Sequence, residues 1–206
     1  MKKRFGFNST IGLQIGYTLP KNFMIGIEGN YLFGTKVKED SILINVSTYP
    51  NAQHINTNGE LDNVRLQESG FVIKLNIGKI FAFNAKHPST GILAMVSGGF
   101  LQHNIWINAK ERLLPQFDKT YRKGYDRMSN GPVVSMMLGF IRLERKKKLN
   151  FYGGLQFDAA FTQNRRAWNF DKNRHDDTKR IDLFLGIRVG WLIPIYTNKD
   201  NVDFFY

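Results

Sequence analysis

The sequence contains no cysteine, few prolines and no long apolar segment. The lack of cysteine excludes a disulfide framework and a thiolate metal site, although it does not identify a compartment. No run of about 18 consecutive apolar residues is present, so we predict no transmembrane helix. The 206 residues suffice for one domain but hardly for two. We therefore predict a single domain that covers residues 1–206.

The chain is instead rich in glycine and aromatic residues, which is typical of crowded strands and tight turns. It has 19 glycines, and 14% of its residues are aromatic. From Ile181 to Ile193, every odd position carries a large apolar residue, while the even positions include Asp182, Arg188 and two glycines. Successive side chains of a strand point to opposite faces. This segment is therefore predicted to be a strand with one apolar face and one mixed face.

The same alternation recurs along the chain and predicts seven strands. They lie at about 5–19, 22–35, 68–83, 91–108, 131–145, 149–164 and 180–196. The connections are alternately short (19–22, 84–90 and 145–149) and long and polar (36–67, 109–130 and 165–179). Short periplasmic turns and long extracellular loops are typical of β-barrels of the bacterial outer membrane. We predict an all-β, antiparallel, up-and-down transmembrane β-barrel of about eight strands, seven of them clear in this chain.

The amino terminus bears on the strand count. Met1-Lys2-Lys3-Arg4 looks like the start of a signal peptide, but the next residues are already strand-like rather than a continuous apolar region. Barrels of this kind normally have an even number of strands, with both termini in the periplasm. An eighth strand is expected from upstream sequence or from the tail Asn201–Tyr206. The predicted orientation favours upstream sequence, because the first visible strand starts on the extracellular side.

Several charged residues fall on the rows predicted to face the interior. They are Glu28, Lys74, Asp158, Asp182 and Arg188. Paired carboxylates can perform acid and base chemistry. However, side chains fill an eight-stranded barrel, and buried charges persist by pairing. We therefore predict a salt-bridged plug in which Arg188 lies between carboxylates drawn from Asp182, Asp158 and Glu28, with Lys74 as a second cation.

Two predicted strands alternate less clearly. Residues 101–108 alternate only in their second half, and residues 133–140 are apolar on both faces. These strands are expected either to pack against another subunit or to fill a narrow lumen.

Motifs for catalysis and metal binding are weak. His103 and Ser97 are six residues apart on one strand, which is about 20 Å, too far for a nucleophile and its base. His175-Asp176-Asp177 has the chemistry of a cation site, but several Arg and Lys residues surround it. The sequence has no P-loop, dinucleotide fingerprint or zinc spacing. We predict no enzymatic activity, no cofactor and no metal site.

The remaining signal is a net charge of +12, from 29 Lys and Arg against 17 Asp and Glu. Aromatic and basic residues interleave from Tyr121 to Arg127, as they do in some nucleic-acid-binding segments. In an outer-membrane barrel, however, basic loop residues meet the phosphates and acidic sugars of lipopolysaccharide. We therefore predict contacts with outer-membrane lipid and lipopolysaccharide, and no binding of nucleic acid. The candidate contact residues are Arg122, Lys123, Arg165, Arg166 and Arg174.

With this strand pattern and loop asymmetry, the chain resembles the small outer-membrane β-barrel proteins of the OmpA/OmpX/OmpW-like type, particularly uncharacterised barrels of Bacteroidota. The similarity includes the residue pattern of segments 150–155 (NFYGGL) and 161–168 (FTQNRRAW). The resemblance implies an outer-membrane location and often a structural role, and it supplies no site residues. We predict a structural protein or a subunit of an envelope assembly, in which other envelope proteins would be its partners. The alternatives are a narrow channel for small solutes and a soluble, lipocalin-like lipid-binding barrel.

Overall fold

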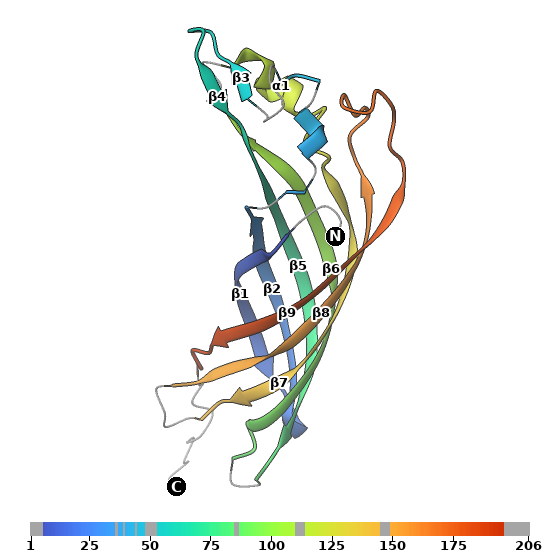
Figure 1. Ribbon diagram of the computed structural model, residues 1–206. Helices are drawn as coiled ribbons and strands as arrows, with labels where there is room; N and C mark the ends of the chain where they lie inside the picture. Colours follow the sequence, from blue (N-terminus) through green and yellow to red (C-terminus); the bar gives the residue numbers. More distant parts are fainter. Residues whose placement is uncertain are drawn as a thin grey trace, which may run out of the picture.

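Most of the chain forms one strongly curved antiparallel sheet (Figure 1). The structure is a computed structural model, which describes residues 6–35, 37–38, 40–43, 45–47, 53–84, 87–109, 114–144 and 149–195. The sheet contains, in spatial order, β1 (Asn8–Thr18), β2 (Phe23–Gly34), β5 (Arg65–Ala82), β6 (Thr90–Asn108), β7 (Ser129–Arg142), β8 (Phe151–Asn164) and β9 (Lys179–Trp191). Each strand pairs with the next along the chain, so the predicted all-β, up-and-down arrangement of seven strands is confirmed.

The connections differ in length at the two ends of the sheet. Between β1 and β2 there is only Leu19 and the short 3-10 helix η1 (Pro20–Asn22), in which Lys21 and Asn22 have positive φ angles of 60 and 62°. The long connections carry the smaller elements: η2 (Asp40–Leu43), the hairpin of β3 (Gln53–Ile55) and β4 (Leu61–Asn63), η3 (Pro115–Phe117) and α1 (Lys119–Arg122). In Figure 1, β3, β4 and α1 gather at the upper end. Among the described residues, no helix is long and apolar enough to cross a membrane.

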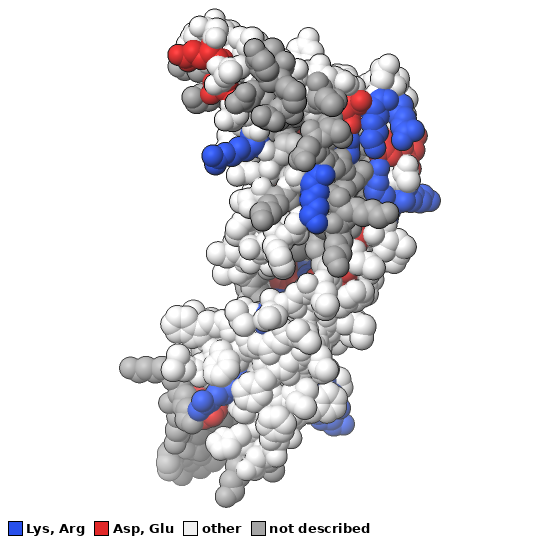
Figure 2. Space-filling model, in the orientation of Figure 1, with Lys and Arg blue, Asp and Glu red and all other residues white. Residues whose placement is uncertain are grey.

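The two faces of the sheet differ sharply in chemistry. Large apolar side chains point outward and are exposed, as are Leu13 (84%), Leu185 (76%) and Ile187 (82%). The carboxylates of the strands and some of their cations point inward, including the buried Glu28 (1% exposed) and Lys74 (2%). Figure 2 shows most of the visible charged side chains towards the two ends of the molecule, with a mostly uncharged surface between them. The predicted outward and inward rows are therefore present, with the polar residues inside.

The strands β1 and β9 form the edges of the sheet. Among the described residues no ladder joins these two strands, so the predicted closed barrel is not observed. Every strand is antiparallel to its neighbour, so the first and the seventh run in the same direction. The sheet curls far enough for Arg188 of β9 to donate a hydrogen bond to Gln14 of β1, at 3.0 Å. The tail Asn201–Tyr206, one predicted source of an eighth strand, lies outside the described residues.

The interior also contains apolar clusters. One lies towards the short connections and is formed by Ile80, Leu93 and Ile141. A second, the middle apolar cluster, comprises Leu32, Val72, Leu101, Val133 and Ala160. The third, at the long connections, contains Ile42, Leu43, Val64, Ile105, Ile107, Leu114, Phe117 and Tyr125. The strand that is apolar on both faces is therefore explained by its interior side, because Val133, Met137 and Ile141 of β7 are buried there.

Candidate functional site

Lys74 of β5 lies in a charged layer inside the curved sheet. Its Nζ atom is 2.9 Å from Glu28 Oε1 and 2.9 Å from Asp158 Oδ1. The same ammonium group donates a hydrogen bond to Ser135 Oγ at 3.1 Å. These partners come from β2, β8 and β7. An isolated buried ammonium group is costly, so two carboxylates and a hydroxyl offset the loss of its hydration.

Arg188 of β9 belongs to the same layer. Its Nη2 atom is 2.6 Å from Glu28 Oε2. The guanidinium group also donates hydrogen bonds to Tyr152 Oη (3.0 Å), Gln156 Oε1 (3.1 Å) and Gln14 Oε1 (3.0 Å). Glu28 therefore lies between two cations. The structure brings four of the five predicted interior residues together: Glu28, Lys74, Asp158 and Arg188.

Asp182, the fifth predicted residue, lies in a second polar layer. Its Oδ2 atom is 3.4 Å from His103 Nε2 and accepts a hydrogen bond from Thr162 Oγ1 at 2.6 Å. His103 Nδ1 is in turn 3.5 Å from Glu68 Oε1. The expected grouping of Asp182 with Arg188 is therefore corrected. The two residues are six apart on one strand, about 20 Å along it, so they face different layers of the interior.

Two residues of the interior, Glu68 and His103, are not among those predicted to face inward. Glu68 could have been found, because it is an even number of residues from Lys74 on the same strand and therefore shares its face. His103 lies where the alternation of its strand is weak, so its direction depended on the pairing with β5 and β7. Ser97 also faces the interior but is paired with Asn76, whereas His103 is paired with Gly70. The two side chains thus occupy different levels of the sheet.

Apolar side chains separate the two polar layers. Along β5 the inward residues run from Ile80 through Gly78, Asn76, Lys74, Val72 and Gly70 to Glu68, and all of them are buried. Val72 belongs to the middle apolar cluster, between the two polar layers, and Ile80 to the cluster at the short connections. A solute moving along the interior would meet three apolar clusters and two polar layers. The polar side chains of the interior therefore do not form one continuous row.

The basic loop residues play different structural parts. Arg166 Nε donates to Asp126 Oδ1 at 2.7 Å, and this hydrogen bond raises the pKa of Arg166. Arg122 donates to two main-chain carbonyl oxygens, of Phe117 (2.6 Å) and Ala109 (3.3 Å). Two of the five predicted lipopolysaccharide contacts therefore also hold the loops together. The others, Lys123, Arg165 and Arg174, are exposed, and Arg165 donates to Asn130 at 2.6 Å.

The loop before β9 contains His175-Asp176-Asp177, for which the sequence predicts no metal site. Asp176 accepts hydrogen bonds from Arg180 and from the main-chain nitrogen of Thr178. Burial raises the pKa of Asp176, but these hydrogen bonds outweigh it and lower the pKa to about 2. The imidazole of His175 packs against the Trp168 ring at 4.9 Å. Within the described part of the chain, no cluster of three or more His, Cys, Asp or Glu residues could hold a metal ion.

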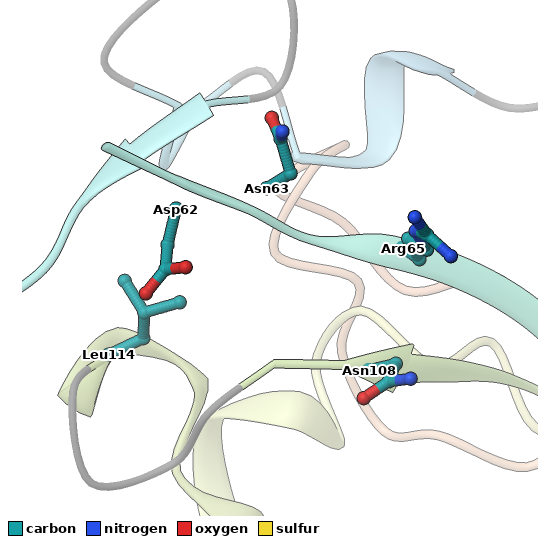
Figure 3. Close-up of a pocket in the computed structure, with 5 residues that line it drawn as sticks. All are labelled: Asp62, Asn63, Arg65, Asn108 and Leu114. Carbon is teal, nitrogen blue, oxygen red and sulfur yellow. The ribbon is translucent and has the colours of Figure 1, made fainter. Parts of the chain in front are cut away.

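A small pocket lies at the rim beside the long connections (Figure 3). Its volume is about 180 Å³, and it is lined by Asp62, Asn63, Arg65, Asn108 and Leu114. Arg65 and Asn108 are paired across the ladder between β5 and β6. Figure 3 shows the Asp62 carboxylate pointing towards Leu114. The lining is mainly polar, with one cation, one carboxylate and two carboxamides.

Comparisons with protein-family models, curated proteins and solved structures give no match to this chain.

Proposed function

We propose that this protein is an integral β-barrel protein of the bacterial outer membrane, with a structural or envelope-assembly role and no enzymatic activity. The observation that carries the proposal is the chemistry of the two faces of the sheet: large apolar side chains cover the outer face, and the buried charged residues of the strands lie on the inner face. Monomeric soluble proteins rarely expose apolar patches larger than a few hundred Å². Here the exposed apolar rows run over all seven strands. A lipid environment gives these rows a favourable surrounding.

A complete barrel requires the edges of the sheet to be joined. Because β1 and β9 run in the same direction, a strand placed between them would be antiparallel to both. Such a strand would give each edge an antiparallel partner and bring the number of strands to eight. This agrees with the rule that closed barrels leave no unpaired edge in the membrane.

The filled interior favours a structural role over the two alternatives. A channel for small solutes needs a continuous polar path, whereas here one apolar cluster separates the two polar layers and another lies at the short connections. A lipocalin-like barrel would direct its apolar row inward around a ligand. The charged residues Glu28, Lys74 and Arg188 occupy that position instead.

Two adjacent residues of β9 provide the test. Leu185 points outward, and Phe184 packs against the middle interior cluster at nearly the same depth. The native residues Trp106, Trp168 and Trp191 would be replaced by Phe, and a single Trp introduced as Leu185→Trp or, as the matched control, Phe184→Trp. The variants would be reconstituted into vesicles of lipids with brominated acyl chains, which quench Trp fluorescence on contact.

We expect strong quenching of the Trp at position 185 and weak quenching at position 184. Equal, weak quenching at both positions would contradict the membrane location, and the reverse order would favour an inward ligand. Conductance of the native protein in planar bilayers tests the channel alternative. We expect no large conductance, and steady ion flux would overturn the structural role.

A further inference from the structure

The charges on the outer face of the sheet are arranged by sign. On the seven strands, the outward charged residues are the cations Arg65, Lys79, Arg142 and Lys179. The carboxylates of the same strands, Glu28, Glu68, Asp158 and Asp182, all face the interior. Arg65 and Lys179 lie at the end with the long connections, and Lys79 and Arg142 lie at the other end. The outer surface near the long connections therefore attracts anions.

One part of this rim also has a pocket and an exposed indole. Arg65 and Asn108 line the pocket of Figure 3, and the next outward pair along the ladder is Gln67 with Trp106. Trp106 is 51% exposed, and the Arg122 guanidinium carbon lies 6.0 Å from its ring centroid. We use the term rim site for the group Asp62, Asn63, Arg65, Trp106, Asn108 and Arg122.

We propose that the rim site binds the phosphorylated sugar headgroup of lipopolysaccharide. This inference rests on the proposed function, because it requires the outer face below the site to lie in the outer leaflet. Guanidinium groups bind phosphate through charge-assisted hydrogen bonds, and Arg65 and Arg122 supply two of them. Carboxamides both donate to and accept from sugar hydroxyls, which suits Asn63 and Asn108, and the Asp62 carboxylate accepts from them.

The surroundings of the rim site fit a lipid with acyl chains. Trp side chains favour the interface between water and hydrocarbon because one end is apolar and the other can hydrogen-bond. Further along the same two strands, Phe71 and Phe100 are exposed on the outer face. An acyl chain would therefore meet apolar side chains directly below the headgroup. Nucleic acid fits less well, because it requires a row of cations along its backbone, whereas this pocket also contains the Asp62 carboxylate.

The experiment uses Trp106 as the reporter of the site. With Trp168 and Trp191 replaced by Phe, the emission of Trp106 would be followed in neutral detergent micelles while lipopolysaccharide is added. We expect a saturable change, weakened by salt. Arg65→Gln should weaken binding about tenfold, as the loss of a charge-assisted hydrogen bond does. The matched control is Arg142→Gln, an outward arginine at the opposite end of the sheet, which should leave binding unchanged.

Two further ligands test separately whether the phosphate and the sugar are recognised. Dephosphorylated lipopolysaccharide should bind weakly if phosphate is recognised, and phosphatidylglycerol should bind weakly if the sugar is recognised. The proposal for the rim site would be wrong if either ligand bound as tightly as lipopolysaccharide. It would also be wrong if Arg65→Gln and Arg142→Gln changed the binding equally. Quenching of the Trp at position 185 by brominated lipid measures the membrane location separately. If that quenching persists while lipopolysaccharide fails to bind, only the present inference fails.

Discussion

Arg188 of β9 forms an ion pair with Glu28 of β2, 2.6 Å apart, although these strands are not neighbours in the sheet. The contact crosses the interior and joins the edge strand β9 to β2, which lies next to the opposite edge strand. Since Lys74 contacts the same carboxylate at 2.9 Å, Glu28 is shared by two cations. Glu28 therefore links the edge strand β9 to β2 across the curved sheet. It also balances the charge of two interior cations.

The first prediction concerns the loss of this cross-link. Arg188→Ala should lower the free energy of unfolding in detergent by about 3 kcal/mol, the lower end of the cost of breaking a buried pair, because Lys74 still partners Glu28. The matched control is Arg142→Ala, which removes a partly exposed pair with Glu144 and should cost about 0–1 kcal/mol. Unchanged stability together with increased ion flux for Arg188→Ala would indicate that the interior charges line a transport path.

The second prediction compares two adjacent glycines of β6. A Cβ atom at Gly99 would lie 2.0 Å from the Ile73 carbonyl oxygen and 2.8 Å from Lys74 Cγ, whereas nothing lies within 4 Å at Gly98. Gly99→Ala should therefore destabilise the protein by about 1–3 kcal/mol, the usual cost of overpacking. Gly98→Ala should leave the denaturant midpoint nearly unchanged. Equal midpoints for the two variants would show that Lys74 does not need the space beside Gly99.

The third prediction concerns acid stability of the loop before β9. The hydrogen bonds of Asp176 lower its pKa from the ordinary 3.8 to about 2. A carboxyl group with a lowered folded-state pKa stabilises the fold above its ordinary pKa, and this stabilisation is lost as the pH falls through about 2. Asp176→Asn should therefore reduce the unfolding temperature near neutral pH. The difference from the native protein should shrink below about pH 4.

The measurement is thermal unfolding followed by circular dichroism between pH 7 and pH 2. Asp177→Asn serves as the control, because Asp177 is the exposed neighbour in the same loop. A difference between Asp176→Asn and the native protein that stays constant down to pH 2 would contradict the lowered pKa.

The fourth prediction tests the depth of the apolar belt. Leu185→Arg, near the middle of β9, should hinder membrane insertion by about 2–4 kcal/mol, because arginine is most costly at the bilayer midplane. Leu149→Arg is the control, since Leu149 is similarly exposed (69%) but lies in a short connection, where the cost should be about 0–1 kcal/mol. Folding yields in vesicles and in detergent would be compared. Equal yields for both variants in vesicles would contradict a hydrocarbon environment around Leu185.

The contacts among the interior charged residues could not be predicted from the sequence. The direction of Glu28, Lys74, Asp158, Asp182 and Arg188 followed from alternation, which depends only on the backbone of each strand. Which of them touch depended on register, strand tilt and curvature. Thus Asp182 contacts His103, and Arg188 contacts Glu28. The loops behave similarly, because Arg166 is held by Asp126, and only folding reveals that partner.

The sequence by itself determined the local features of this protein: seven strands, their inner and outer faces, and the difference between short and long connections. These depend on neighbouring residues and on a period of two. Only the tertiary structure decided the separation of the interior into polar and apolar layers, the partners of each buried charge and the pocket beside Arg65. The physical reason is that such contacts join strands distant in the chain, so they depend on the curvature of the whole sheet, which local residue patterns do not specify.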